Sequence, residues 1–296
     1  MNAMLMALPG AESFAGHLRE HLGCEAGELL LHQFPDGETC PQLTPAVAGR
    51  DVILVAALHQ PDHKIMALYL CACVARELGA RSVGLVAPYL PYMRQDASFA
   101  PGQGVTARHF ARLLSGCFDS LVTVDPHLHR FHQLSELYGI ATEVVPAAPE
   151  IAAWISANVE RPVLVGPDEE SEQWVGQVAV AVGCPYTVLR KVRSGDREVS
   201  VSLPPAGVLA DSTPVLVDDI ISTARTMIAA TLQLKAAGCA PPVCIGVHAL
   251  FGGAAYAELK AAGAGRIVSC DTVPHASNAI GMGAPMATAV ARMLGG

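Results

Sequence analysis

Short apolar segments alternate with longer helical patterns along the first half of the chain. Residues 51–56, 82–87 and 120–124 are rich in Val, Leu and Ile, which is typical of buried strands. The stretches 63–78 and 105–114 have the residue pattern of helices. Strands separated by helices of this length indicate a parallel sheet with right-handed crossover connections.

The same alternation restarts in the second half, so the two halves of the chain look alike. The segment 51–92 (strand, polar loop, helix, strand) parallels the segment 214–251. We therefore predict an α/β fold with two similar doubly wound parallel-sheet domains, residues 1–145 and 146–285. A last helix over 286–296 is expected to pack on the first domain. The second half has predicted strands at 162–165, 187–189, 215–217 and 243–247, and predicted helices at 171–182 and 226–237.

The composition favours a soluble metabolic enzyme. Hydrophobic residues make up 51% of the chain and charged residues 16%, which suits buried strands rather than disorder. The net charge is −8 and no run of Lys or Arg occurs, which argues against nucleic acid as a partner. The apolar stretch 66–75 has about half the length of a membrane-spanning helix, and the N-terminus lacks the charged head of a signal peptide. We expect a cytoplasmic protein without a membrane partner.

The cysteines are predicted to be core residues rather than metal ligands or disulfides. The chain has 9 of them, an odd number that argues against a complete disulfide scaffold. Cys71 and Cys73 are the closest pair, and in a helix their side chains diverge by about 200°, so they cannot share one zinc ion. Most of the others lie among Val, Ala and Leu, where cysteine acts as a small apolar residue.

The most informative segment is 215–227. Apolar β-formers end in Asp218 and Asp219, a small hydroxyl-rich loop follows, and an Ala-rich helical stretch begins at Met227. A helix N-terminus offers backbone N–H groups to an anion such as phosphate, and adjacent carboxylates can accept hydrogen bonds from sugar hydroxyls. The alternative is a buried strand followed by an ordinary Ser or Thr helix cap. The loop comprises Ser222, Thr223, Ala224, Arg225 and Thr226.

Further acids are expected at the carboxyl ends of strands, where doubly wound sheets bind ligands. Asp96, Asp125 and Asp168 share this expected location with Asp218 and Asp219, although a strand-end Asp often only caps the next helix. Asp125 begins the sequence Asp-Pro-His-Leu-His, which offers oxygen and nitrogen ligands at close spacing. Zinc would require softer ligands nearby, so magnesium held mainly through phosphates fits better. The alternative here is a polar turn with exposed histidines.

Residues 187–203 have the pattern of a β-hairpin with a Ser-Gly-Asp turn. Strand alternation places Lys191 and Arg193 on one face. Two cations on a mobile flap can close over a polyphosphate and stabilise the charge that builds up in phosphoryl transfer. The alternative is a solvated edge hairpin that is protected by its charges.

The loop at 218–226 resembles the signature of proteins that bind phosphoribosyl pyrophosphate (PRPP), such as the type I phosphoribosyltransferases and PRPP synthetase. Phe-Pro-Asp-Gly-Glu at 34–38, Pro-Tyr-Leu-Pro-Tyr-Met-Arg-Gln-Asp at 88–96 and Val-Thr-Val-Asp-Pro-His at 122–127 are similar to three further PRPP synthetase motifs, in that family's order. On this resemblance, which covers nearly the whole chain, the protein is identified as a divergent member of the PRPP synthetase (ribose-phosphate pyrophosphokinase) family. The resemblance implies two domains of the type I phosphoribosyltransferase-like kind.

The resemblance also implies an enzyme, a ribose-phosphate diphosphokinase. Such an enzyme transfers the diphosphoryl group of Mg²⁺–ATP to O1 of ribose 5-phosphate and produces PRPP and AMP. Asp218 and Asp219 would then hold the ribose hydroxyls, and the loop 222–226 would hold the 5-phosphate. Lys191 and Arg193 would be the catalytic residues of the flap.

For the nucleotide, the resemblance implies an adenine site at the turn 34–38, often contributed across a subunit interface of a homo-oligomer. An aromatic ring beside two acids can stack on adenine and accept hydrogen bonds from its amine, although without the resemblance the segment is only a turn. An arginine suits bidentate phosphate binding. The implied ATP-binding residues are Phe34, Asp36, Gly37, Glu38, Arg94, Gln95, Asp96 and His127. The implied metal-site residues are Asp125 and His127 for the magnesium–ATP site, and Asp168 for a second metal ion or the ribose.

The chain departs from the family pattern at three places. Arg225 replaces the usual Gly in the phosphate loop, and an L-residue would be strained by about 1–2 kcal/mol there if the position requires a positive φ. Ala97 and Ser98 stand where the family usually has basic residues. The acidic segment 169–171 replaces small residues and adds negative charge near a diphosphate.

Two other functions remain open from the sequence. One is a weakly active regulatory subunit of the PRPP synthetase kind. The other is a phosphoribosyltransferase, against which the motifs at 34–38 and 94–96 argue. An ordinary P-loop kinase is excluded, because the chain contains no Gly-Lys dipeptide.

Overall fold

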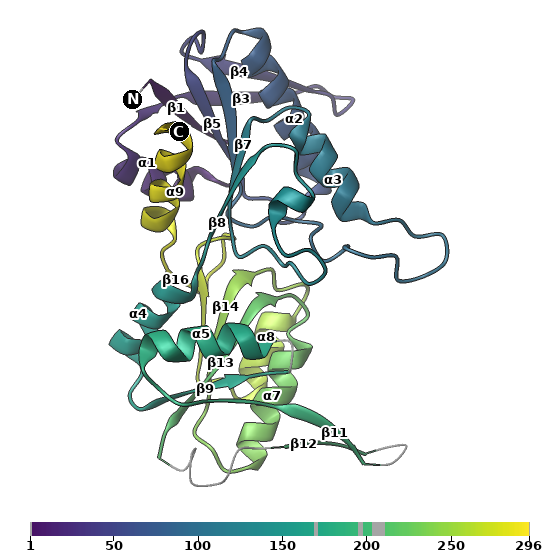
Figure 1. The fold of residues 1–296 in the computed structure, drawn as a ribbon, viewed down its shortest axis with the longest axis vertical. Helices are drawn as coiled ribbons and strands as arrows, with labels where there is room; N and C mark the ends of the chain where they lie inside the picture. Colours follow the sequence, from purple (N-terminus) through teal and green to yellow (C-terminus); the bar gives the residue numbers. More distant parts are fainter. Residues whose placement is uncertain (1, 169–170, 195–197, 203–210, 296) are drawn as a thin grey trace. The chain divides into compact units, whose positions relative to one another are not determined.

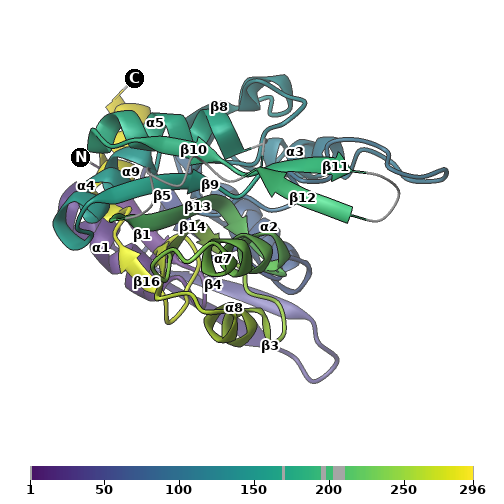
Figure 2. The same cartoon turned by 90° about the horizontal axis from the view of Figure 1, so that it is seen from below.

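The computed structural model describes residues 2–168, 171–194, 198–202 and 211–295. It divides into two compact units (Figures 1 and 2). Unit 1 comprises Met1–Val145, Thr272–Pro274 and Met282–Gly296, and unit 2 comprises Pro146–Asp271 and His275–Gly281. In the described part of the chain, no helix is both long and apolar enough to cross a membrane.

Unit 1 is built on a six-stranded parallel sheet with the order β2-β1-β5-β6-β7-β8. An antiparallel hairpin of β3 and β4 follows β2 in the chain. The strands are β1 (Ala3–Ala7), β2 (Glu25–Ala26), β3 (Glu28–Gln33), β4 (Thr39–Thr44), β5 (Asp51–Val55), β6 (Ser82–Val86), β7 (Ser120–Val124) and β8 (Ala141–Val145), and the helices are α1 (Glu12–Leu22), α2 (Asp62–Glu77), α3 (Thr106–Ser115), the short 3₁₀ helix η1 (Leu134–Glu136) and α9 (Gly283–Gly295).

Unit 2 is built on a second six-stranded parallel sheet with the order β10-β9-β13-β14-β15-β16. An antiparallel hairpin of β11 and β12 follows β10 in the chain. Helix α4 packs beside α5, and α7 packs beside α8. Figure 2 shows these two pairs on opposite faces of the sheet. The strands are β9 (Pro162–Gly166), β10 (Tyr186–Val188), β11 (Arg190–Ser194), β12 (Glu198–Ser202), β13 (Thr213–Ile221), β14 (Val243–Ala249), β15 (Arg266–Cys270) and β16 (Asn278–Ile280), and the helices are α4 (Ala148–Asn158), α5 (Glu172–Val182), α7 (Arg225–Ala236) and α8 (Ala255–Ala262).

The two sheets have the same connectivity. In each unit the first strand of the sheet is flanked by the second and third, the remaining strands follow in chain order, and a hairpin is inserted between the second and third. This confirms the prediction of two similar doubly wound α/β halves. Because the strands of both sheets are parallel, their carboxyl ends meet at one edge of each sheet, and ligands bind beyond that edge in folds of this kind.

The apolar runs predicted the central strands because helices cover both faces of each sheet. All residues of β5 and β14 are buried, which gives continuous rather than alternating apolar sequences. The helices predicted at 63–78, 105–114 and 226–237 are α2, α3 and α7, with ends shifted by one residue.

Two predicted elements have different bounds in the structure. The strand predicted at 215–217 extends to Ile221, because β13 continues to pair with β14 through Ile220 and Ile221. Asp218 and Asp219 therefore lie within this strand and not after it. The hairpin predicted at 187–203 begins only at Arg190, because Tyr186–Val188 pairs with β9 in the main sheet. Of the predicted Ser-Gly-Asp turn at 194–196, Ser194 is the last residue of β11 and the other two residues lie outside the described residues.

The cysteines are free thiols, as predicted, and five of the nine are buried. Burial raises the pKa of the Cys71, Cys117 and Cys244 thiols to about 12, so these groups are neutral at physiological pH. Cys40 is exposed and is the exception to the predicted core location.

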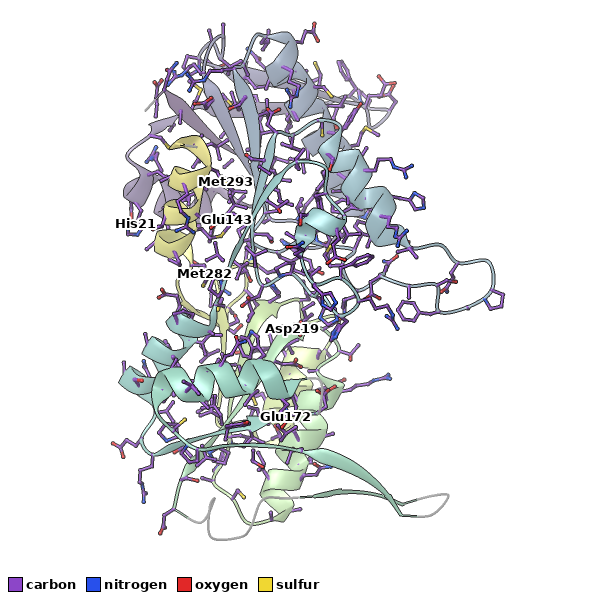
Figure 3. All side chains as sticks on the ribbon, in the orientation of Figure 1. His21, Glu143, Glu172, Asp219, Met282 and Met293 are labelled. Carbon is purple, nitrogen blue, oxygen red and sulfur yellow. The ribbon has the colours of Figure 1, made fainter. Side chains whose placement is uncertain are left out.

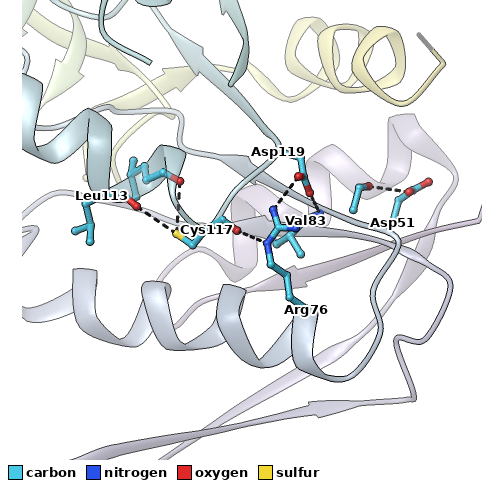
Figure 4. A network of polar contacts seen from close by, with 8 residues as sticks. Asp51, Arg76, Val83, Leu113, Cys117 and Asp119 are labelled. Atoms are coloured by element: carbon cyan, nitrogen blue, oxygen red, sulfur yellow. Dashed lines mark hydrogen bonds and ion pairs between the residues drawn. The ribbon is translucent and has the colours of Figure 1, made fainter. Parts of the chain in front are cut away.

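Charged side chains at the amino ends of the unit 1 strands make structural contacts (Figure 4). Arg76 of α2 bonds to Asp119 at 2.8 Å and to the Cys117 carbonyl at 2.9 Å, and Asp119 accepts the Val83 N–H at 2.7 Å. Asp51, buried at the start of β5, accepts hydrogen bonds from Arg81 and Ser82. The Arg81 guanidinium holds the pKa of Asp51 below its usual range. This edge is consolidated by internal contacts, which leaves the carboxyl edge for ligands.

Helix α9 returns to unit 1 at the end of the chain. It lies beside α1, β7 and β8, and its first residue approaches α1 so closely that a Cβ on Gly283 would lie 3.0 Å from that of His17. Arg292 forms an ion pair with Glu143 of β8. Figure 3 shows Met282, Met293 and Glu143 around this helix.

Candidate functional site

The acidic pair of unit 2 lies in the carboxyl-terminal part of β13. The Asp219 N–H donates to Asp218 Oδ1 at 3.0 Å. Asp168 follows β9, which is the neighbour of β13 in the sheet, so the acids lie at the same carboxyl edge. Burial, and then the charges of Asp219 and Asp168, raise the pKa of Asp218 well above its ordinary value. A neutral donor such as a sugar hydroxyl would relieve this crowding of carboxylates. Figure 3 labels Asp219.

The loop between β13 and α7 leaves the helix N-terminus uncapped. Ala224 is the N-cap residue, in the left-handed conformation with φ 56° and ψ 9°, and no side chain caps the helix. The N–H groups in the first turn of an α-helix have no acceptor within the helix. The alternative of an ordinary Ser or Thr cap is therefore wrong, because the cap residue has no acceptor oxygen. The first-turn N–H groups of α7 lie at the positive end of a helix dipole, which favours an anion.

The positive φ in this loop lies at Ala224 and not at Arg225. Arg225 is the first residue of α7 and is exposed, so its side chain brings no left-handed strain. The expected penalty of about 1–2 kcal/mol for an L-residue therefore falls on Ala224. Arg225 and Thr226 lie in the first helical turn, beside the unpaired N–H groups, where a cation or a hydroxyl can contact a bound anion.

The loop after β14 forms backbone hydrogen bonds with the loop between β13 and α7. The Gly252 N–H donates to the Ser222 carbonyl at 3.0 Å, and the Phe251 N–H donates to the Ile221 carbonyl at 2.9 Å. The Phe251 ring packs against His275 at 4.7 Å and Tyr256 at 5.2 Å between ring centroids. Sequence reasoning missed this support. The Gly-Gly pair that follows Phe251 was the available signal, because it marks a tight loop at a strand end.

Asp168 also makes a local turn. Its Oδ1 accepts the Ser171 N–H at 3.2 Å, and its carbonyl accepts the Ser171 hydroxyl at 2.6 Å. Asp168 thus shapes the turn before the next helix, which was the structural alternative to a ligand role for a strand-end Asp. The two roles are compatible. The acidic residues Glu169 and Glu170 lie outside the described residues.

In unit 1, Asp125 directly follows β7 and has a positive φ of 30°. Its N–H donates to the Val145 carbonyl at 3.2 Å. The His127 and His129 rings meet edge to face at 4.0 Å. Among the residues that the structure describes, no three His, Cys, Asp or Glu side chains are grouped as a metal site. A magnesium ion here would depend on phosphate oxygens and water for most of its coordination.

The segment Arg94–Asp96 forms a turn well beyond the end of β6. The Gln95 N–H donates to the Tyr92 carbonyl at 2.9 Å. Arg94 and Gln95 are exposed, whereas Asp96 is buried and accepts a hydrogen bond from Arg130 Nη1 at 2.8 Å. The prediction that Asp96 lies at a strand end is therefore wrong, because the chain runs through a long loop between β6 and this turn.

The turn predicted at 34–38 closes the β3–β4 hairpin. The Phe34 N–H donates to the Glu38 carbonyl at 2.8 Å, and the Glu38 N–H donates to Asp36 Oδ1 at 3.2 Å. Gly37 has a φ of 92°, a conformation that favours glycine. The Phe34 side chain is 45% exposed, with the His32 ring edge-on at 4.6 Å. An exposed aromatic ring beside two acids is available for stacking on a base.

The β11–β12 hairpin carries the two cations predicted for the flap. In its register Lys191 is opposite Val201 and Arg193 is opposite Val199. The two residues therefore occupy alternate positions of one strand. Their side chains lie outside the part of the structure that is described.

Comparisons with known proteins agree with these features. Residues 3–117 match the family described as the N-terminal domain of ribose phosphate pyrophosphokinase, and residues 140–286 match the phosphoribosyl transferase domain family. The ribose-phosphate pyrophosphokinase of Methanopyrus kandleri is 33% identical over 280 residues, which are 94% of this chain and 95% of that protein. That of Halobacterium salinarum is 33% identical over 288 residues, 97% of this chain and 100% of that protein.

The fold agrees with a solved structure. A phosphoribosylpyrophosphate synthetase from Mycobacterium smegmatis superposes with a TM-score of 0.88 and covers 100% of this chain and 99% of that one. At 21% sequence identity this similarity concerns the fold.

Proposed function

The chain belongs to the ribose-phosphate pyrophosphokinase family, and we propose that it transfers the β,γ-diphosphoryl group of ATP to O1 of ribose 5-phosphate, producing PRPP and AMP. The similarity supports this activity because it covers nearly the full length of both curated relatives. The observation that carries the proposal is the loop between β13 and α7, where an acidic pair adjoins an uncapped helix N-terminus.

Ribose 5-phosphate is assigned to this loop because its two ends match the two chemical features there. The 5-phosphate would accept hydrogen bonds from the N–H groups at the start of α7, with Ser222 and Thr226 as hydroxyl donors. The ribose hydroxyls would donate to Asp218 and Asp219, whose crowded carboxylates favour neutral donors over anions. A molecule bound in this way has its O1 exposed for reaction.

The nucleotide is assigned to unit 1. Phe34 would stack on the adenine, with acceptors from Asp36 and Glu38 at the turn. Arg94 and Gln95 are exposed for contact with the phosphates, in line with the preference of guanidinium for phosphate oxygens. We include in the proposal a homo-oligomer in which the exposed hairpin tip serves the nucleotide site of a neighbouring copy.

Catalysis would depend mainly on positioning and electrostatics, since phosphoryl transfer requires little covalent help from a protein. Lys191 and Arg193 would neutralise the charge that develops on the transferred group. Magnesium, held mainly by the nucleotide phosphates with Asp125 and His127 as protein ligands, would supply further charge neutralisation, and Asp168 would help to place a second metal ion or the ribose. The free cysteine thiols suit a reducing compartment, which supports the cytoplasm as the location.

The products formed from Mg²⁺–ATP and ribose 5-phosphate test this proposal. Chromatography of the nucleotides and ³¹P NMR of the sugar phosphate should show AMP and PRPP in equal amounts. ADP with a singly phosphorylated sugar would instead mean γ-phosphoryl transfer and would contradict the proposal. ATP binding without any product would favour a regulatory subunit.

A further inference from the structure

One side chain of unit 1 connects the two loops that carry the proposed nucleotide residues. Arg130 lies in the loop after β7, shortly beyond Asp125 and His127. Its Nη1 donates to Asp96 Oδ1 at 2.8 Å, and its guanidinium carbon lies 5.6 Å from the centre of the Phe99 ring. Arg130 therefore contacts the loop after β6 at two points, one of them in the turn that presents Arg94 and Gln95.

The ion pair between Arg130 and Asp96 is unequal in burial. The Asp96 side chain is only 5% exposed, whereas that of Arg130 is 58% exposed. A buried carboxylate needs a cation or several donors, and losing its partner is strongly unfavourable. Arginine meets this need because its planar group can stack on Phe99 while one edge donates to the acid.

Other contacts fix the opposite end of the same turn. The Tyr92 hydroxyl donates to Asp62 at the start of α2, and its ring packs against Phe110 at 4.7 Å. The Gln95 carbonyl accepts the N–H of Ala107 in α3 at 3.2 Å. The turn is thus held on one side by α2 and α3 and on the other side by Arg130. Arg94 and Gln95 are exposed residues of this turn.

We propose that Arg130 is a positioning residue of the nucleotide site. Through Asp96 it sets the place of the Arg94–Gln95 turn relative to the loop of Asp125 and His127, so that both loops face the same polyphosphate. Asp96 then acts as the anchor of the turn and does not itself contact the nucleotide. This inference rests on the proposed function, because it assumes that the two loops bind one ATP.

Replacement of Arg130 tests the inference through two separate Michaelis constants. Arg130→Met keeps much of the aliphatic stem but removes the ion pair, so the KM for ATP should rise about tenfold, which equals about 1.4 kcal/mol of binding. The KM for ribose 5-phosphate should not change, because that site is assigned to unit 2. Arg130→Lys should restore part of the affinity. A rise of both constants together with a lower Tm would indicate a merely structural role and overturn the inference.

A double-mutant cycle distinguishes loss of the Arg130–Asp96 contact from misfolding caused by an unpaired buried carboxylate. Asp96→Asn combined with Arg130→Met removes both charges, so no buried carboxylate is left without a partner. If the residues act through their contact, the double variant should be no weaker in ATP binding than Arg130→Met alone. Additive losses would contradict the coupling. Arg266→Met is the control, since Arg266 also stacks on a ring, that of Trp154 at 4.6 Å, but lies in unit 2, and the KM for ATP should be unchanged.

Binding measurements separate this inference from the proposed reaction. Calorimetric titration of a non-hydrolysable ATP analogue gives a Kd for each variant without turnover. If the wild type forms no AMP, the proposed function fails, yet a tenfold weaker Kd in Arg130→Met would still support the positioning role. An unchanged Kd would overturn the positioning role even in an active enzyme.

Discussion

The two units share one connectivity but differ in the residues at the carboxyl end of the equivalent central strand. In unit 1, Val55 is followed by Ala-Ala-Leu, whereas in unit 2 Val217 is followed by Asp-Asp-Ile. The acidic pair that we assign to the ribose hydroxyls therefore has apolar counterparts at 56–57. Equal folds do not give equal sites, since the side chains of one loop decide the ligand.

The start of the following helix differs in the same sense. Neither α7 nor α2 has a side-chain cap, but the N-cap residue of α7 is Ala224 in the left-handed conformation, whereas that of α2 is Pro61, which has no N–H. In unit 1 the loop before α2 is also contacted by a side chain of the helix. Lys64 Nζ donates to the Ala57 carbonyl at 2.7 Å and lies 3.4 Å from the His59 ring nitrogens. The residues at the two helix starts therefore differ, and we assign the anion to the loop of unit 2.

The inserted hairpins, β3–β4 in unit 1 and β11–β12 in unit 2, also differ in the chemistry of their side chains. Both occupy the same place in the connectivity. The β3–β4 hairpin ends in an exposed aromatic ring and two acids, which suits a base, whereas β11 carries Arg190, Lys191 and Arg193, which suit a polyphosphate. We therefore propose that the hairpin serves recognition of the base in unit 1 and charge neutralisation in unit 2.

The largest expected effect is the loss of a cation from the β11–β12 hairpin. Lys191→Ala should lower kcat about 10²–10³-fold, because it removes one of the two charges proposed to neutralise the transition state. The KM values should change far less. Steady-state kinetics measure both constants. Ser200→Ala on the facing strand is the control, and a Lys191→Ala variant that keeps most of its kcat would contradict the catalytic assignment.

Replacement of the buried acid should separate function from stability. Asp218→Asn should lower kcat/KM for ribose 5-phosphate about 10–100-fold, since it weakens hydrogen bonds to a charged group. It should also raise Tm, because it removes repulsion from Asp219 and Asp168. The control is Asp119→Asn at the opposite edge of the unit 1 sheet, which should lower Tm and leave both KM values unchanged.

The pH dependence of stability provides a second measurement on the same variant. The folded-state pKa of Asp218 is raised, so ionisation of this group disfavours the folded state. Its contribution to stability should fall as the pH rises from the ordinary carboxyl pKa through the folded value. Denaturant unfolding across this range should show the decline in the wild type and not in Asp218→Asn. Equal pH profiles would contradict the assigned shift.

A smaller effect is expected at the hairpin of unit 1. Phe34→Ala should raise the KM for ATP about tenfold, because stacking of a base on an aromatic ring contributes roughly 1–3 kcal/mol. Leu30→Ala on the same hairpin is the control, since Leu30 is similarly exposed at 48% against 45% for Phe34. If both variants change KM equally, the loss reflects the hairpin and not the ring.

The smallest effects concern backbone strain, which both units share. Gln60 has a φ of 52° before α2, and Ala224 has a φ of 56° before α7. Glycine at either position should raise the free energy of unfolding by about 0.5–1 kcal/mol, less at Ala224 because its methyl group is buried. Ala229→Gly, at an exposed position inside α7, should instead lower it by about 1 kcal/mol. Urea titration measures all three, and destabilisation by Gln60→Gly would contradict the assigned strain.

The sequence predicted the parts of the fold that are buried on both sides. The strands β5, β6, β7, β9 and β14 are continuous apolar runs because helices cover both faces of the sheets. The extension of β13 to Ile221 depends on the length of its partner β14, and no local pattern reports this pairing. The edge strands β2 and β16 are too short to give a pattern.

For the candidate site, the sequence predicted the chemistry of each loop better than its geometry. The acids at 218–219 and the helix start after them were predicted, but the cap residue Ala224 was not, because its φ depends on how the loop closes. The pairing of Asp96 with Arg130 joins residues 34 positions apart in the chain, so only the folded unit reveals it. The sequence therefore reveals which charged residues lie in each loop, whereas the residues that they pair with are known only from the folded structure.

The claim that only unit 2 binds a pentose phosphate is tested most directly by titration calorimetry with ribose 5-phosphate. We predict one site per chain. Thr226→Asp places an anion in the first turn of α7 and should abolish binding without disturbing the helix, which favours acids there. His63→Asp at the same position of α2 should leave binding intact. Two sites per chain, or binding lost in His63→Asp and retained in Thr226→Asp, would contradict the account.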